Sequence, residues 1–232
     1  MKKSMCISAV LAWSLMVQAN LHADPKETVV AAAKKLADAG GYTWVNKRDG
    51  SRFFQGQVKG QVRKDGAVLV ENPGMQGDTY LMAISGEHRA AETQDGWQSL
   101  AEMQNAEGFG RFFARMVEQF KTPSEEIADL VQHVEAFTGE GDSVEGKLKT
   151  DGVEAMLSFG GRGGQGPEIS NPSGHLKVSL KDGSLTGYVL TLKGSMSFNG
   201  NDFELDRISN VTISEVGSTE FEIPEAAQAK LK

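Results

Sequence analysis

The sequence predicts an α+β fold built on a large curved antiparallel sheet, an incomplete barrel of about ten strands that amphipathic helices cover. Tight hairpin turns need positive φ angles, which Asp-Gly and Asn-Gly pairs supply. Such pairs recur at 49–50, 65–66, 95–96, 151–152, 182–183 and 199–200. Apolar residues alternate with polar ones over long stretches, as is typical of strands. Two helical patterns interrupt the strands, and 27 glycines suit a curved sheet better than a helical bundle.

The first 23 residues have the pattern of a signal peptide. Lys2 and Lys3 precede an apolar run at 7–17, which is too short to span a bilayer. We expect cleavage after Ala23, which leaves residues 24–232 as a single domain, changes the net charge from −7 to −9 and removes Cys6, the only cysteine. An uncleaved N-terminal anchor is the alternative. The sequence therefore predicts a periplasmic or secreted protein without disulfides that is not anchored to the membrane.

Composition and motifs argue against several function classes. The negative net charge argues against a nucleic-acid partner and against an anionic membrane surface. His88, His133 and His175 lie far apart without the spacing of zinc ligands, so we expect no metal site and no cofactor. The chain has no Gly-x-Ser-x-Gly elbow, so we expect no catalytic residue and no enzyme. A secreted hydrolase whose distant carboxylates converge stays open as a less favoured alternative.

A helix and a series of hairpins begin the domain. Asp24 at the N-cap, Pro25 at N1 and Glu27 at N3 form a capping-box pattern, and Gly40-Gly41 ends the helix. Strand patterns follow at 54–62, 67–70, 79–84 and near His88. Two glycines, at 56 and 60, share the apolar face of the first of these strands, which predicts that this strand curves or that something approaches it closely.

A helical block follows the first hairpins. Trp97, Leu100 and Met103 suit a short helix. A stripe of phenylalanines and other apolar residues from 109 to 120 then follows the i, i+3, i+4, i+7 pattern of an amphipathic helix. A second capping box at 122–125 starts another helix, whose apolar face we expect to run from Ile127 to Val134.

The second half of the chain returns to strands. We predict strands at 144–149, 176–180, 188–198 and 203–213, and a short helix around 153–157. The segment 221–224 is expected to end the sheet. A glycine-rich segment at 160–167 could form an anion nest, but it lacks the Gly-Lys-Ser/Thr of a nucleotide loop, and we interpret it as a flexible connector.

The phenylalanine stripe raises the question of a ligand pocket. Aromatic stripes on helices usually belong to the core. If the helices and the sheet do not collapse fully onto each other, however, an apolar pocket remains between them. The residues expected to line it are Trp44, Phe54, Tyr80, Phe109, Phe112, Phe113, Met116, Leu190 and Met196.

Several segments carry a resemblance to a known group of folds. They are Tyr42-Thr43-Trp44, Asp95-Gly96-Trp97, Val144-Glu145-Gly146, residues 181–185 and residues 216–227. Their order resembles that of the bacterial outer-membrane lipoprotein carriers, the LolA-like fold, and of the related LppX-type lipid-binding lipoproteins. The resemblance implies an incomplete antiparallel barrel wrapped around helices, with a cavity for acyl chains. It transfers no functional residue to this chain.

Two functions remain in view. The first is an exported binding protein that holds a lipid or the acyl chain of a lipoprotein between the sheet and the helices. The alternative is a ligand-free structural or protein-interaction module of the cell envelope. A cavity in the interior favours the first, and a filled core favours the second.

Overall fold

The computed structural model describes residues 24–232 except 51–54, 75–78, 159–168 and 199–200. The predicted signal peptide, Phe54 and the glycine-rich segment 160–167 therefore lie outside the described residues. No helix within the described ranges is both long and apolar enough to cross a membrane.

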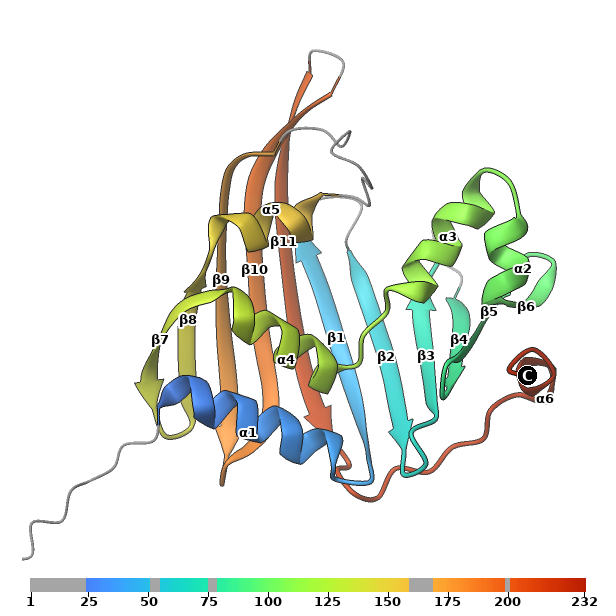
Figure 1. The fold of residues 1–232 in the computed structure, drawn as a ribbon, viewed down its shortest axis with the longest axis horizontal. Helices are drawn as coiled ribbons and strands as arrows, with labels where there is room; N and C mark the ends of the chain where they lie inside the picture. The colour runs from blue at the N-terminus through green and yellow to red at the C-terminus, as the bar shows by residue number, and fades with distance from the viewer. Residues whose placement is uncertain (1–23, 51–54, 75–78, 159–168, 199–200) are drawn as a thin grey trace, which may run out of the picture.

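A single antiparallel sheet of eleven strands organises the molecule, in the order β6-β5-β4-β3-β2-β1-β11-β10-β9-β8-β7 (Figure 1). The strands are β1 (Gly41–Gly50), β2 (Gly56–Arg63), β3 (Val68–Pro73), β4 (Thr79–Ser85), β5 (His88–Thr93), β6 (Gly96–Ser99), β7 (Val134–Glu140), β8 (Ser143–Leu148), β9 (Ile169–Lys181), β10 (Ser184–Phe198) and β11 (Asn201–Ser214). The sheet does not close, because β6 and β7 are free edges in this order. The predicted α+β fold is confirmed, with one strand more than expected.

The first and the last strand of the sequence meet in the middle of the sheet. β1 pairs with β11 from Thr43 opposite Ser214 to Gly50 opposite Arg207. Hairpins extend from this joint in both directions, so each half of the sheet consists of neighbours in sequence. Among the described strands, the pairing of β1 with β11 is the one strand pairing that joins the two halves of the sheet.

One face of the sheet, here called the inner face, is covered by five helices (Figure 1). These helices are α1 (Pro25–Ala37), α2 (Leu100–Asn105), α3 (Phe109–Glu118), α4 (Pro123–His133) and α5 (Thr150–Leu157). The strand registers place the predicted apolar face on this side, including Trp44, Val58, Met82 and Leu192. The predicted alternation of apolar and polar residues is thus confirmed for these strands.

Glycines on the inner face let bulky groups approach the backbone. A Cβ atom on Gly60 would lie 2.0 Å from Cζ2 of Trp44, because the indole of that residue covers Gly60 from the adjacent strand. A Cβ atom on Gly174 of β9 would lie 2.7 Å from Cγ2 of Val153 on α5. The close approach predicted for Gly60 is therefore confirmed, and the approaching group is an indole ring.

Capping residues fix the helix starts that the sequence predicts. The side chain of Asp24 accepts a hydrogen bond from the amide of Lys26 at 3.0 Å, and Pro25 begins α1. At α4, Thr122 and Glu125 form the reciprocal capping box, with Pro123 in the first turn. Both helices begin where an orphan amide finds a side-chain acceptor.

Three expectations about the elements are wrong. Trp97 belongs to β6, and α2 begins only at Leu100, because Ser99 and Glu102 cap it there. Val134 is the first residue of β7 and not part of α4; its apolar side chain is buried in both patterns, so periodicity could not separate them.

The segment 221–224 is the third wrong expectation, since it forms no strand. The chain crosses there to the outer face of the sheet, where Ile223 packs with Ala67 and Ala83. The short helix α6 (Glu225–Gln228) follows and adds Ala227 to this second cluster. Arg63 holds the crossing segment, because its Nη1 donates to the carbonyl of Phe221 at 2.9 Å.

Candidate functional site

The part of the inner face under α3 is aromatic. Tyr80 of β4 and Phe113 of α3 meet edge to face, with ring centroids 5.0 Å apart and planes at 70°. Phe113 is 9% exposed, whereas Met116, one turn further along the same helix, is 45% exposed. α3 therefore turns Phe113 to the sheet, whereas Met116, which the amphipathic pattern places on the same apolar face, is exposed to solvent.

The segment 119–122 connects α3 to α4 and lies over the centre of the sheet. Phe120 stacks on Trp44 of β1, with centroids 6.4 Å apart and planes at 30°. Arg89 of β5 holds the end of α3: its Nη1 donates to the carbonyl of Val117 at 2.9 Å and to that of Phe120 at 3.3 Å. The connector is thus attached to the sheet by one aromatic stack and one guanidinium group.

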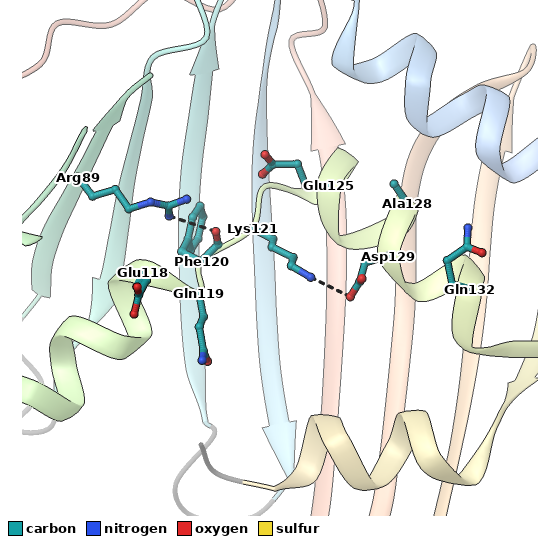
Figure 2. A pocket seen from close by; sticks show the side chains of 9 residues that line it. All are labelled: Arg89, Glu118, Gln119, Phe120, Lys121, Glu125, Ala128, Asp129 and Gln132. Carbon is teal, nitrogen blue, oxygen red and sulfur yellow. Dashed lines mark hydrogen bonds and ion pairs between the residues drawn. The ribbon is translucent and has the colours of Figure 1, made fainter. Parts of the chain in front are cut away.

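A pocket of about 490 Å³ lies beside this connector (Figure 2). It is lined by Arg89, Glu118, Gln119, Phe120, Lys121, Glu125, Ala128, Asp129 and Gln132. Most of these side chains are polar, and Lys121 forms an ion pair with Asp129 at 2.8 Å. None of the residues predicted to line an apolar pocket contributes to it, so this pocket differs from the expected one.

Hydrogen bonds tie α4 to two tyrosines of the inner face. Tyr42 Oη and Ser124 Oγ lie 3.0 Å apart, and the hydroxyl of Tyr188 donates to Glu126. Burial raises the pKa of Tyr42, and it raises that of Tyr188 well above the ordinary value, where the charge of Glu126 acts in the same direction. Both phenols therefore stay neutral at physiological pH, and their hydrogen bonds fix α4 on the sheet.

The structure places the predicted ligand-lining residues in three groups. Tyr80 and Phe113 contact each other under α3, and Trp44 contacts the connector through Phe120. Leu190, at 2% exposure, is part of the main core, and the half-buried Met196 packs against that core. Met116 points to solvent. Phe109 and Phe112 lie on α3, but their side chains, like Phe54, are outside the described residues.

A polar cluster on the inner face was not predicted. Asn46 and Arg48 lie on the same face of β1 as Trp44; on β11, Ser209 lies opposite Arg48, and Arg207 lies opposite Gly50. The sequence did contain a signal for this cluster: each of these polar residues occupies an inward position of a strand whose neighbouring inward positions are apolar. Their proximity could not be predicted, since it depends on the pairing of the first with the last strand.

No grouping within the described ranges offers three His, Cys, Asp or Glu side chains to a metal ion. His133, at the end of α4, lies against the α5 backbone, where a Cβ on Gly152 would be 2.8 Å from its Nδ1. The groups gathered on the inner face are instead aromatic rings, a guanidinium pair, a hydroxyl and an amide. Such groups can bind an amphiphile without forming covalent bonds.

Comparison with known proteins gives a structural likeness only. No protein-family model matches the chain, and no curated protein sequence matches it. Among solved structures the chain is similar to LprF from Mycobacterium bovis, with 10% identity, a TM-score of 0.46 and coverage of 88% of this chain and 97% of that chain. It is also similar to the Mycobacterium tuberculosis lipoprotein LppX, with 11% identity, a TM-score of 0.44 and coverage of 84% and 98%. LppX thus belongs to one of the two groups that the sequence resembles.

Proposed function

We propose that the protein is an exported binding protein that holds a lipid or an acyl chain between α3 and the inner face of the sheet. The observation that carries this proposal is the contact of Phe113 with Tyr80, where an amphipathic helix covers an aromatic side chain of the sheet. An acyl chain that replaced this contact would bury apolar area of its own, at roughly 25 cal/mol per Å². Binding of this kind needs no catalytic group.

The way in which α3 is attached to the sheet would allow this helix to act as a movable cover of the ligand. The helix begins at Gly108, whose φ is 60°, without a side-chain cap, and it is held at its other end by Arg89. Opening would therefore separate one aromatic pair, two hydrogen bonds to Arg89 and the core contacts of Ala114 and Val117. By contrast, α4 is fixed by the capping box at Thr122 and by two tyrosine hydroxyls.

Native mass spectrometry of the protein purified from the envelope fraction of its host tests the proposal. We expect a stoichiometric adduct that solvent extraction identifies as an acyl species. The variant Phe113→Glu should lose the adduct, because a carboxylate in the contact with Tyr80 would exclude an acyl chain. The variant Met116→Glu is the matched control on the exposed face of the same helix, and it should keep the adduct.

A second candidate function is a protein-interaction module without a ligand. It is favoured by the packing on the α1 and α4 side, where Leu176, Leu190 and Leu192 are almost completely buried. A folded protein that carries no adduct, and that binds no added acyl probe, would support this alternative and contradict lipid binding.

A further inference from the structure

Polar side chains interrupt the apolar inner face at the joint between β1 and β11. Arg48 stands directly opposite Ser209, and Gly50 stands opposite Arg207. Asn46 precedes Arg48 by two residues and therefore lies on the same face. The four side chains of Asn46, Arg48, Arg207 and Ser209 form what we call the joint cluster.

Atoms of the joint cluster are buried without hydrogen-bond partners. Asn46 is 8% exposed and Ser209 is 1% exposed, yet neither Oδ1 of Asn46 nor Oγ of Ser209 has a partner. Nε of Arg48 is likewise buried without an acceptor. Buried polar groups are almost always paired in native proteins, so three such atoms on one face point to a missing partner.

The charge balance of the joint cluster indicates what kind of partner is missing. Among the described residues Arg48 forms no ion pair, and Glu126, the acidic residue that acts on it from α4, accepts the hydroxyl of Tyr188. Burial lowers the pKa of Arg48, and the positive charge of Arg207 lowers it further. A partner that carries negative charge would relieve both effects.

We propose that the joint cluster binds the anionic head group, a carboxylate or a phosphate, of the amphiphile whose chain lies under α3. This inference rests on the proposed function and names the class of its ligand. The guanidinium of Arg48 can donate two parallel hydrogen bonds to such an oxyanion, and the hydroxyl of Ser209 can donate a third. The amide of Asn46 can donate as well when it is turned, since its oxygen and nitrogen are interchangeable at the level of side-chain shape.

The position of the joint cluster fits this arrangement. Tyr80 and Arg48 lie within electrostatic range of each other, so the cluster adjoins the aromatic pair of Tyr80 and Phe113. On the other side, Leu190 and Leu192 pair with Ser209 and Arg207 and are fully buried. The chain of the ligand therefore extends from Arg48 toward α3 and not toward β10.

Binding of palmitate and of methyl palmitate tests the inference, because the two differ only in the charge of the head group. Displacement of a fluorescent polyene fatty acid gives both dissociation constants. We expect palmitate to bind about 10- to 100-fold more tightly than its methyl ester. The variant Arg48→Gln should remove this difference, and Lys47→Gln, on the same strand but the outer face, should keep it.

Further probes distinguish the sources of the anion. Palmitoyl lysophosphatidic acid binding more tightly than palmitate would assign the joint cluster to a phosphate head group. If millimolar inorganic phosphate displaces the fluorescent probe, and the affinity of the ligands does not depend on their acyl chain, the joint cluster is a site for a free anion, and the inference of an amphiphilic ligand is overturned.

The outcomes separate this inference from the proposed function. Equal affinity of palmitate and its methyl ester overturns the head-group inference while the proposed lipid binding stands. If neither binds, both fail. The comparison of the acid with its ester uses the unaltered protein, so the test remains decisive even if Arg48→Gln does not fold.

Discussion

The two halves of the inner face are covered in different ways. Over β7 to β11 and β1, the helices α1, α4 and α5 pack on a part of the sheet that contains the long strands β1, β9, β10 and β11, with capped starts at Asp24 and Thr122 and a close contact at the backbone of Gly174. Over β3 to β6 the strands are short, and α3 lies on them with an uncapped start and an exposed Met116. From this difference we expect the first half to contribute more to the stability of the fold and α3 to be the helix that can separate from the sheet.

The largest expected effect tests the packing of the first half. The substitution Leu192→Ala should lower the free energy of unfolding by about 3 kcal/mol, because Leu192 has no exposed area. The loss comes from the apolar area that is no longer buried and from the cavity left behind. Phe113→Ala should cost about 1 kcal/mol, a value below the usual range, because α3 can settle onto the sheet. Urea denaturation measures both. Equal losses would contradict the contrast between the two halves.

The joint cluster should behave in the opposite way. Replacing Arg48 by Met removes a half-buried charge without an ion-pair partner among the described residues, so the ligand-free protein should become more stable by about 1–2 kcal/mol. Lys47→Met on the outer face is the control and should change stability little. Thermal unfolding of delipidated protein provides the measurement, and a strongly destabilised Arg48→Met would identify Arg48 as a structural residue.

The cap of α4 should contribute a smaller amount. Thr122 Oγ1 donates to Glu125 at 2.7 Å, and the capping box satisfies orphan amides of the first turn. Thr122→Ala should therefore lower the unfolding free energy by about 1 kcal/mol. Thr122→Ser, which retains the hydroxyl, should restore most of it. An alanine variant as stable as the original would show that tertiary contacts alone hold α4.

Acidification should produce the smallest effect, at the outer face. Hydrogen bonds from Arg63 lower the pKa of Asp65 to about 2, so this carboxylate stabilises the folded state above its ordinary pKa near 4. That contribution is lost as the pH falls from about 4 to 2. Arg63 also donates to the carbonyl of Phe221, and Trp97 packs against the same outer-face cluster as Phe221, so the fluorescence of Trp97 should report release of the tail. In Asp65→Asn the change over this pH range should be smaller, and the remainder comes from Glu102, because its hydrogen bond from Lys230 of the tail lowers its pKa to about 2 as well.

Sequence patterns predicted the elements better than their positions in space. Alternation identified the inner face from Trp44 to Met196, and capping residues fixed the starts of α1 and α4, because both signals are local. β7 was missed because Val134 continues the apolar pattern of α4. The segment 221–224 was misassigned because its apolar residues pack on the outer face and not in a strand ladder.

The candidate site was only partly predictable for the same reason. Phe113 and Tyr80 were both expected to line a pocket, since each is aromatic and lies on the predicted inner side. Asn46 and Arg48 were not predicted as site residues, because a polar residue near the end of an apolar alternation usually marks the end of a strand. Their meeting with Ser209 depends on a pairing between residues more than 160 positions apart.

The pairing of β1 with β11 also has a consequence for how the chain folds. Thr43 and Ser214 are 171 residues apart, so closing this joint requires ordering a long loop. Contacts between residues so far apart in the sequence slow folding, because the chain loses conformational entropy before the contacts between the strands can stabilise it. Each series of hairpins can form locally, but the sheet cannot become continuous before its last strand has been synthesised. Until β11 has been synthesised, the two halves of the sheet therefore stay separate, and one edge of β1 stays unpaired.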